Sequence, residues 1–578
     1  MKVFPDDIFN LADIALDVAR KDPERIAVID LDGYDSKGKR CYKHYTYREL
    51  SADAESVAPG LREIGIAERT RTVFMASPSY EACVMGLALA RVGAMTVWID
   101  TGVGYLNIAE RLGRVGIEAF FGLPVAHLGR FIFGWGPRTL HKLIVTGKPG
   151  FPGAHTVNSL RRKAPANPTP PSVTPDDPAA ILYTTGSTGP AKPTLYLHRN
   201  FCQLYRNAHY SWRFDLKKEI PVDFAVFPAF LFIPISAGGT MVVPPINFVR
   251  QGPADVDPRA LIEVINDCNV KSMFGSPVLL ENMGRFALKN GIKTPSLKRI
   301  VGAGDIIKAS VEKLLLEMMD ADGEVYSNYG ATEAMPSTEM DAVETLKETW
   351  SKTERGAGIC VGRPLPGVEL RIISIVDGPI KTMDEAEEVN KGKIGEILVR
   401  GKHISPLYYR EEESTMKNKI QDRNGEFWHR FGDAGYIDKE GRLWVCGRVS
   451  HRVKTVDGPV FPLTCEAIFD THPKVRRSGL VGVPEKDGQI PVICIELKPE
   501  YRSVDAAMLR AELLALAAKY DTTGCIQHLL FKSRLPLDPR HNSKIERPLL
   551  AKWATGQLQK KQNVPTTTRH MNAAQRPR

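Results

Sequence analysis

The sequence lacks the features that mark membrane-spanning, secreted and zinc-binding proteins. Its longest apolar runs, such as residues 224–235, are interrupted by proline and fall short of the roughly 20 apolar residues of a membrane helix. The first seven residues include two aspartates, where a secretory leader would be basic and then apolar. The nine cysteines are scattered and none belongs to a Cys-x-x-Cys pair, so we expect free thiols. These absences predict a cytoplasmic protein without a transmembrane segment.

A basic face interleaved with aromatic residues is also missing, which argues against nucleic-acid binding. Half of the net charge of +10 comes from residues 556–578, which carry five lysines and arginines and no acid. Because this segment has few large apolar residues, we predict a disordered basic tail. A plain solvated end is its simplest interpretation, and a contact with a membrane surface is the alternative.

The length and the hydrophobic pattern indicate more than one domain. A chain of 578 residues exceeds one ordinary core. Residues 72–75, 80–92 and 95–99 alternate between strand-like and helix-like patterns, which favours an α/β architecture. After residue 395 the segments shorten and become β-like, and beyond residue 448 a compact α+β pattern follows. We therefore predict domains at residues 1–447 and 448–555, followed by the tail at 556–578.

A loop rich in hydroxyls and glycines lies between Tyr183 and Lys192. Glycines let backbone N–H groups approach anionic oxygens, hydroxyls add donors, and the lysine supplies a positive charge. Ala191 before the lysine and Pro193 after it separate this loop from a Walker-type loop, which leads into a helix. Because residues 194–197 are strand-like, we predict a polyphosphate loop between two strands. An ordinary surface loop is the alternative.

This loop resembles the phosphate loop of the adenylate-forming superfamily, which contains acyl-CoA synthetases, luciferases and adenylation domains. Four further segments match in order, and the resemblance extends from about residue 23 to residue 553: Tyr329-Gly330-Ala331-Thr332-Glu333, Lys393-Ile394-Gly395-Glu396, Gly432-Asp433-Ala434-Gly435-Tyr436, and Gly447-Arg448 with a late Lys544. The resemblance implies an α/β fold with a large N-terminal domain of several sheets, including a small β-barrel-like part. It also implies a small mobile α+β C-terminal domain.

The resemblance implies ATP and Mg²⁺ as cofactors and a small-molecule carboxylic acid as substrate. Both reactants are anions, so the site must first cancel their repulsion. The implied catalytic residues are Lys544, Thr332, Glu333 and Lys192. Glu333 and Thr188 are the implied metal ligands, since Mg²⁺ prefers oxygen. The implied nucleotide-binding residues are Thr184, Thr185, Gly186, Ser187, Thr188, Gly189, Gly302, Ala303, Gly304, Tyr329, Gly330, Asp433 and Arg448.

Each of these residues also has a structural interpretation. Glu333 suits the first turn of a helix, Asp433 suits a turn, and Lys544 suits a solvated surface. An acyl pocket is the further hypothesis for apolar residues beside the matched motifs, although such residues more often belong to a core. They are Phe227, Phe230, Phe232, Phe274, Val278, Leu279 and Met335.

Several positions depart from the pattern of acyl-CoA synthetases. Ala191-Lys192-Pro193 replaces Pro-Lys-Gly, Leu231 follows Pro228-Ala229-Phe230 in place of a histidine, and Ser450 replaces the hinge aspartate or lysine. The glycine-bearing loop that shapes the pantetheine tunnel is replaced by residues 455–461. These departures weaken the prediction of a thioester-forming enzyme.

The same chain is similar to the β-lactone synthetases of olefin biosynthesis. The shared segments are Phe274-Gly275-Ser276-Pro277, Cys446-Gly447-Arg448, His451-Arg452-Val453, Gly458-Pro459, His472-Pro473 and Arg540-His541-Asn542. This resemblance implies adenylation of a long-chain 3-hydroxy acid and closure to a β-lactone, with other enzymes of a hydrocarbon or secondary-metabolite pathway as partners. An acyl-CoA or acyl-AMP ligase and a non-catalytic binder of nucleotide or acyl groups are the alternatives.

Overall fold

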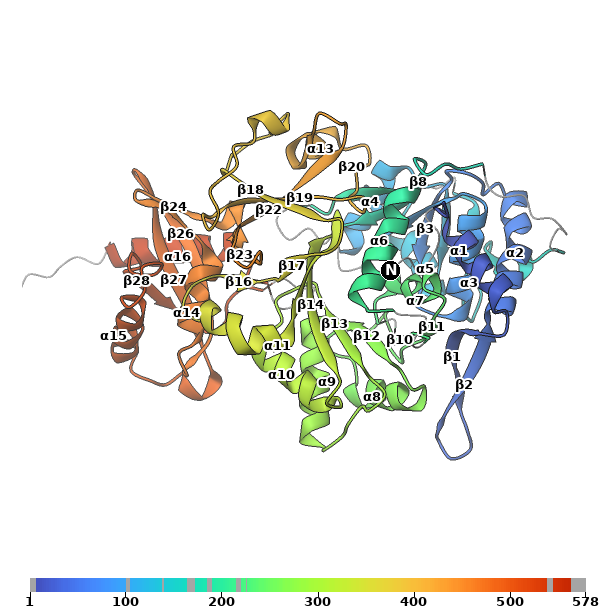
Figure 1. Cartoon of the computed structure of the whole chain (residues 1–578), viewed down its shortest axis with the longest axis horizontal. Coiled ribbons are helices and arrows are strands. Elements are labelled where there is room, and N and C mark those ends of the chain that lie inside the picture. The colour runs from blue at the N-terminus through green and yellow to red at the C-terminus, as the bar shows by residue number, and fades with distance from the viewer. Residues whose placement is uncertain are drawn as a thin grey trace, which may run out of the picture. The chain divides into compact units, whose positions relative to one another are not determined.

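The computed structural model describes residues 7–99, 104–137, 140–163, 172–184, 190–214, 220–224, 226–537 and 544–562. The chain forms two compact units (Figure 1). Within the described ranges, unit 1 is built from residues up to Ser351 and from Ile359–Val445, and unit 2 from Lys352–Gly358 and from Cys446 onward. No helix in these ranges is both long enough and apolar enough to cross a bilayer.

The first large sheet of unit 1 carries the stem of the predicted phosphate loop. Its strand order is β20-β9-β8-β4-β3-β5-β6-β7. The predicted strand–helix–strand pattern is confirmed, because β3 and β4 are parallel and α3 connects them. The strands are β3 (Arg71–Met75), β4 (Met95–Trp98), β5 (Ala119–Gly122), β6 (Lys142–Val145), β7 (His155–Thr156), β8 (Pro178–Tyr183), β9 (Pro193–Leu197) and β20 (Leu407–Tyr408). The helices of this region are α2 (Tyr47–Glu63), α3 (Tyr80–Arg91), α4 (Tyr105–Val115), α5 (Pro124–Phe133) and α6 (His198–Ser211).

The second large sheet of unit 1 has the order β17-β15-β14-β13-β12-β10-β11-β1-β2. Its central strands are parallel, and β15 returns antiparallel to β14. The strands are β1 (Ile26–Tyr34), β2 (Arg40–Thr46), β10 (Val222–Phe224), β11 (Thr240–Val242), β12 (Ser272–Gly275), β13 (Arg299–Gly302), β14 (Glu324–Ala331), β15 (Ala334–Asp341) and β17 (Arg363–Pro364). The helices that follow or connect these strands are α7 (Phe232–Ser236), α8 (Pro258–Asp267), α9 (Pro277–Lys289), α10 (Ala309–Met318) and α11 (Ala342–Glu344), whereas α1 (Leu11–Lys21) packs against α2 and α3.

A third sheet has the order β16-β23-β22-β19-β18, with β21 paired to β22. The part expected to resemble a barrel is thus an open sheet, while the α/β fold class is confirmed. Strands β22 and β23 form a hairpin at Asp438, whose backbone N–H donates to the Arg442 carbonyl at 3.0 Å. The elements are β16 (Ile359–Cys360), β18 (Glu369–Ile373), β19 (Gly395–Arg400), α13 (Glu412–Asn418), β21 (Lys419–Gln421), β22 (Phe427–Ile437) and β23 (Leu443–Arg448).

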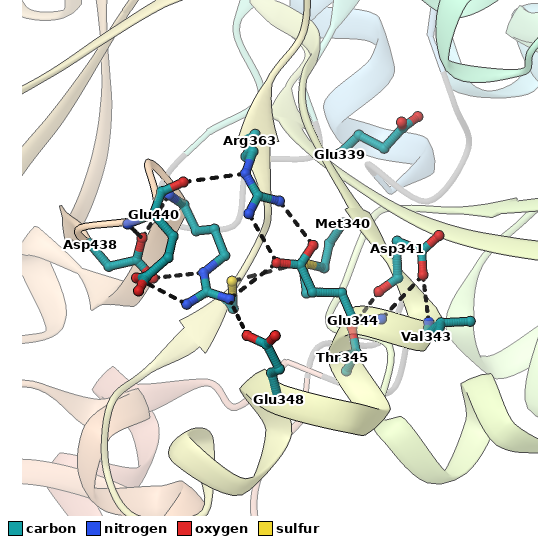
Figure 2. A network of polar contacts seen from close by, with 12 residues as sticks. Glu339, Met340, Asp341, Val343, Glu344, Thr345, Glu348, Arg363, Asp438 and Glu440 are labelled. Carbon is teal, nitrogen blue, oxygen red and sulfur yellow. Dashed lines mark hydrogen bonds and ion pairs between the residues drawn. The ribbon is translucent and has the colours of Figure 1, made fainter.

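A buried arginine joins the third sheet to the second. The side chain of Arg442 is 1% exposed, and its guanidinium donates to Asp438 Oδ2 at 2.7 Å, Glu348 Oε2 at 2.9 Å and Glu344 Oε1 at 3.1 Å. The Glu344 carboxylate also accepts two hydrogen bonds from the guanidinium of Arg363, so the cluster is a connected network (Figure 2). A buried guanidinium is tolerated only when carboxylates surround it. The network therefore fixes the β22–β23 hairpin against the segment that follows β15.

Unit 2 is a small α+β body. Strands β26 (Val475–Glu485) and β27 (Gly488–Leu497) pair antiparallel, and β28 (His528–Phe531) runs parallel to β27. The other elements are β24 (Val453–Thr455), β25 (Gly458–Val460), α14 (Pro462–Asp470), α15 (Ala506–Ala517) and α16 (Arg547–Gln562). Helix α16 continues through residues 556–562, which the sequence pattern assigned to the tail. Residues 563–578 lie outside the described ranges.

Candidate active site

The Tyr-Gly-Ala-Thr-Glu segment forms the end of β14 and its turn into β15. Tyr329 pairs with Thr338 and Ala331 with Ala334, so Thr332 and Glu333 occupy a tight hairpin turn. The helix-start interpretation of Glu333 is therefore wrong. Gly330 is required here, because a Cβ at this position would lie 2.6 Å from the Ala334 carbonyl oxygen. The turn places Glu333, which is 8% exposed, at the end of strands β14 and β15.

Tyr329 and Asp433 are far apart in sequence and adjacent in the fold. The Tyr329 hydroxyl donates to Asp433 Oδ2 at 2.7 Å, and Asp433 is 9% exposed on β22. The Tyr329 ring lies 5.1 Å from the ring of Phe431, measured between centroids. An aromatic face beside a fixed carboxylate provides both a stacking surface for a base and acceptors for ribose hydroxyls.

Glu333 lies in a cluster of tyrosines and lysines. Its Oε1 accepts a 2.5 Å hydrogen bond from the Tyr408 hydroxyl, and the ammonium of Lys192 lies 4.9 Å from the centroid of the Tyr408 ring. The hydroxyl of Tyr196 donates to the Thr332 carbonyl at 2.7 Å and ties the turn to β9. Two of the residues implied as catalytic, Glu333 and Lys192, are thus gathered around one tyrosine.

The cluster also contains a buried lysine that the sequence pattern did not reveal. Lys419 is 5% exposed, its ammonium donates to the Ser405 carbonyl at 2.5 Å, and it lies 6.0 Å from the centroid of the Tyr408 ring. The pKa of Lys419 is lowered to about 7, chiefly by burial; the negative charge of Glu333 opposes this shift and the positive charge of Lys192 adds to it. In its protonated form, Lys419 beside Glu333 increases the positive potential that an anionic ligand meets.

The stem of the predicted phosphate loop is closed by paired hydrogen bonds. The Thr184 N–H donates to the Lys192 carbonyl at 3.0 Å, and the Lys192 N–H donates to Thr184 Oγ1 at 2.9 Å. The two strands predicted on either side are confirmed as β8 and β9, which pair antiparallel. The remaining loop candidates, Thr185, Gly186, Ser187, Thr188 and Gly189, lie outside the described residues.

The other nucleotide candidates follow the carboxyl end of β13. Gly302 is its last residue, the Ala303 N–H donates to the Gly275 carbonyl at 3.4 Å, and Gly304 has a φ of +95°. Because β13 and β14 are parallel neighbours, Gly302 lies beside Ser327 on the strand that carries Tyr329. Carboxyl ends of parallel strands are a common ligand-binding edge of α/β sheets.

Lys544 and Arg448 belong to unit 2. Lys544 lies directly before Ile545, which forms an isolated bridge with Leu537, and α16 begins at Arg547. Arg448 ends β23 at the start of unit 2. Their roles at the nucleotide stay predictions.

The acyl-pocket candidates do not form one group. Three phenylalanines form a row of edge contacts: the ring centroid of Phe230 lies 5.1 Å from that of Phe227 and 4.8 Å from that of Phe274. Phe227 is 38% exposed. Phe232 packs over Gly86, where a Cβ would lie 2.1 Å from its ring, and is core. Leu279 is buried in the core of the second sheet, whereas Val278 and Met335 are half-buried. The pocket stays a prediction that is best supported by the three connected phenylalanines.

The acidic residues of the site fit a Mg²⁺ ion that is bound mainly by substrate phosphates and only in part by the protein. Among the described residues no group of three or more histidines, cysteines or acids could hold a metal ion. Mg²⁺ is typically bound through one or two carboxylates together with substrate phosphates and water, and buried Glu333 fits that role. The sequence analysis missed four residues of this cluster because each belongs to a segment without a motif: Tyr196, Tyr408, Ser405 and Lys419. Lys419 in particular has the sequence context of a surface lysine.

Known structures share this fold. The amide bond synthetase McbA from Marinactinospora thermotolerans covers 94% of this chain with a TM-score of 0.75 and 19% identity. ATP-bound MatB from Rhodopseudomonas palustris covers 94% with a TM-score of 0.71 and 20% identity. The chain therefore shares the fold of these two enzymes.

Sequence comparison gives the family. Residues 16–409 match the family model described as AMP-binding enzyme. The olefin beta-lactone synthetase of Xanthomonas campestris pv. campestris is 35% identical over 93% of this chain and 96% of its own length. That of Stenotrophomonas maltophilia is 34% identical over 96% and 99%, respectively. The chain belongs to the AMP-binding enzyme family and is an AMP-forming ligase that uses ATP.

Asp433→Ala is expected to weaken ATP binding about tenfold or more, because a charged acceptor of hydrogen bonds contributes about 1.5–3 kcal/mol. Tyr329→Phe is the matched control, since it removes only the hydroxyl that donates to Asp433 and is expected to cost less. Calorimetric titration with ATP measures both affinities. An unchanged affinity in Asp433→Ala would contradict the ribose role.

Proposed function

We propose that this ligase adenylates the carboxylate of a long-chain 3-hydroxy acid and then closes the product to a β-lactone. The observation that carries the proposal is the near-full-length similarity, at about 35% identity, to two olefin beta-lactone synthetases. The altered residues at Leu231, Ser450 and 455–461 support it, because they replace positions that thioester-forming relatives use.

In the first step a carboxylate oxygen attacks the α-phosphorus and pyrophosphate leaves. Glu333 is the proposed Mg²⁺ ligand, and bound Mg²⁺ would spread the phosphate charge. Lys192 is the proposed cation for the phosphate oxygens, the protonated form of the buried Lys419 adds to the positive potential, and Lys544 is a further proposed catalytic residue. Asp433 accepts the ribose hydroxyls, and Tyr329 provides the face against the base.

In the second step the 3-hydroxyl oxygen attacks the activated carbonyl carbon. The bond from that carbon to the phosphate oxygen breaks, AMP leaves, and the hydroxyl proton is released. An intramolecular hydroxyl held in the right orientation reaches an effective molarity of about 10⁵ to 10⁸ M. Departure of AMP and pyrophosphate offsets the strain of the four-membered ring. Because the substrate's own hydroxyl is the acceptor, no external thiol takes part.

The decisive experiment compares two acids of equal chain length, one with a 3-hydroxyl and one without. With ATP and Mg²⁺, both acids are expected to release pyrophosphate, and mass spectrometry is expected to find a β-lactone from the hydroxy acid alone. The lactone yield is expected to be independent of CoA. If thioester forms on adding CoA and lactone is absent, the protein is an acyl-CoA ligase.

An acyl-CoA ligase is the second candidate. Two relatives that are named as CoA ligases support it at lower identity. The acyl-CoA ligase sidI of Aspergillus fumigatus and the indoleacetate–CoA ligase of Aromatoleum aromaticum are each 24% identical to this chain. The same two-acid experiment separates this candidate from the first.

A further inference from the structure

Glu333, the proposed metal ligand, is held at two points by one short segment of the chain. The Ser405 backbone N–H donates to the Glu333 carbonyl oxygen at 3.0 Å. Three residues further along, the Tyr408 hydroxyl donates to Glu333 Oε1 at 2.5 Å. We call residues 405–408 the Glu333 clamp. The clamp ends in β20 of the first large sheet, whereas Glu333 lies at the end of β14 and β15 in the second, so it joins the two sheets at the candidate site.

The clamp is itself firmly attached to its surroundings. Its last two residues form β20, which pairs antiparallel with β9. The backbone N–H of Tyr408 donates to Thr415 Oγ1 at 3.0 Å. Ser405 and Tyr408 are 0% and 2% exposed. Side chains in close-packed interiors occupy defined rotamers, so the Tyr408 hydroxyl has a defined position beside the carboxylate.

Lys419 holds the other end of the clamp. Its ammonium donates to the Ser405 carbonyl oxygen at 2.5 Å and lies 6.0 Å from the centroid of the Tyr408 ring. Lys419 is placed by the pairing of β21 with β22, where it lies opposite His429. Strand β22 also carries Asp433, the proposed ribose acceptor. The clamp therefore connects the proposed metal ligand to the sheet that holds the proposed ribose acceptor.

The clamp occupies only one of the two carboxylate oxygens of Glu333. Oε1 accepts from Tyr408, and within the described part of the chain no hydrogen bond engages Oε2. A carboxylate that is held at one oxygen presents the other in a fixed direction, which is how supporting hydrogen bonds orient metal ligands. Because Mg²⁺ demands near-octahedral geometry, the direction of a single carboxylate oxygen affects how well the site binds it.

We propose that Tyr408 is a positioning residue for the metal, whose hydroxyl orients Glu333 so that Oε2 meets the Mg²⁺ of the bound nucleotide. This inference rests on the proposed role of Glu333 as the metal ligand. Tyr408 acts through Glu333, while Lys419 and the backbone of Ser405 keep the clamp in place. The affinity for the metal therefore depends on the Tyr408 hydroxyl, whereas the affinity for the nucleotide without metal does not.

A purely structural role for the Tyr408 ring is the alternative. The ammonium groups of Lys192 and Lys419 lie 4.9 and 6.0 Å from the ring centroid, so the ring also packs beside two cations. Phenylalanine preserves the ring and its faces and removes the hydroxyl alone. Tyr408→Phe thus separates the effect of the hydroxyl on Glu333 from the packing of the ring.

The test measures metal binding without turnover. Mn²⁺, which prefers the same oxygen ligands as Mg²⁺, is titrated into the full chain with α,β-methylene-ATP, and free Mn²⁺ is measured by electron paramagnetic resonance. The protein is kept in excess over the analogue, so that little analogue binds Mn²⁺ in solution. Tyr408→Phe is expected to raise the Kd of Mn²⁺ about tenfold, a loss typical of removing a group that supports a metal ligand. Its affinity for the analogue in EDTA is expected to be unchanged.

In turnover the effect is expected to be confined to the Mg²⁺ dependence. Tyr408→Phe should raise the Mg²⁺ concentration required for half-maximal pyrophosphate exchange, and excess Mg²⁺ should restore the rate. In a Glu333→Gln background the same substitution is expected to have no further effect, because residues that act through one contact are not additive. Tyr205→Phe in α6 is the matched control. The buried Tyr205 hydroxyl has no hydrogen-bond partner among the described residues, so wild-type metal binding is expected.

Thermal unfolding checks that each variant is folded. Wild-type Mn²⁺ affinity in Tyr408→Phe, together with weaker binding in Glu333→Gln, would overturn the inference and leave the metal-ligand role of Glu333 intact. If Glu333→Gln itself binds Mn²⁺ like the wild type, both the metal-ligand role and the inference are wrong. A loss in Tyr408→Phe that persists in the Glu333→Gln background would show that Tyr408 acts by another route and would also overturn the inference. The organic acid is absent from the binding measurements, so the β-lactone assignment is tested separately.

Discussion

Lys544→Ala is expected to slow acid-dependent pyrophosphate exchange about 10²-fold or more, the magnitude typical of a lost transition-state charge stabiliser. The ammonium of Lys544 would be required only while negative charge shifts on the α-phosphate. ATP affinity and the unfolding temperature are therefore expected to change little. Single-turnover adenylation measures the effect directly.

The control for this variant is Lys552→Ala, which removes an exposed lysine from α16 in the same unit. It is expected to retain wild-type exchange. If Lys544→Ala adenylates at the wild-type rate, the implied role of Lys544 is wrong, while the nucleotide site of unit 1 would stand.

Glu333→Gln is expected to lower adenylation about 10²-fold and to raise the Mg²⁺ concentration required for half-maximal rate. Glutamine preserves the size of the side chain and an oxygen that can accept from Tyr408, so the change removes mainly negative charge. Loss of a carboxylate ligand weakens binding of a hard cation. Exchange assays across a Mg²⁺ titration measure both quantities.

The matched control is Glu312→Gln in α10. Burial raises the pKa of Glu312 to about 8, so this carboxyl is largely neutral at pH 7 and glutamine resembles its native form. The folded-state pKa lies above the unfolded one, so the stability associated with neutral Glu312 is lost as pH rises toward 8.

Wild-type Mg²⁺ dependence in Glu333→Gln would remove the metal-ligand assignment.

Secondary structure was predictable where the pattern that specifies it lies within one continuous segment. The alternation at 72–99 gave β3, α3 and β4, because two short apolar strand-like runs flank a longer apolar segment, which forms a helix that is buried almost all round. The loop between two strands followed from Pro193 and the strand-like residues after it. Glu333 was harder, since Thr-Glu is compatible with both a helix start and a turn, and the pairing of β14 with β15 decides between them.

Sequence alone determined the family, the order of the motifs and the chemistry that each motif brings. Only the tertiary structure brought Asp433 to Tyr329 and placed Tyr408 and Lys419 around Glu333. The physical reason is that contacts between distant segments depend on strand pairing and on buried ion clusters such as that of Arg442, which no local pattern encodes.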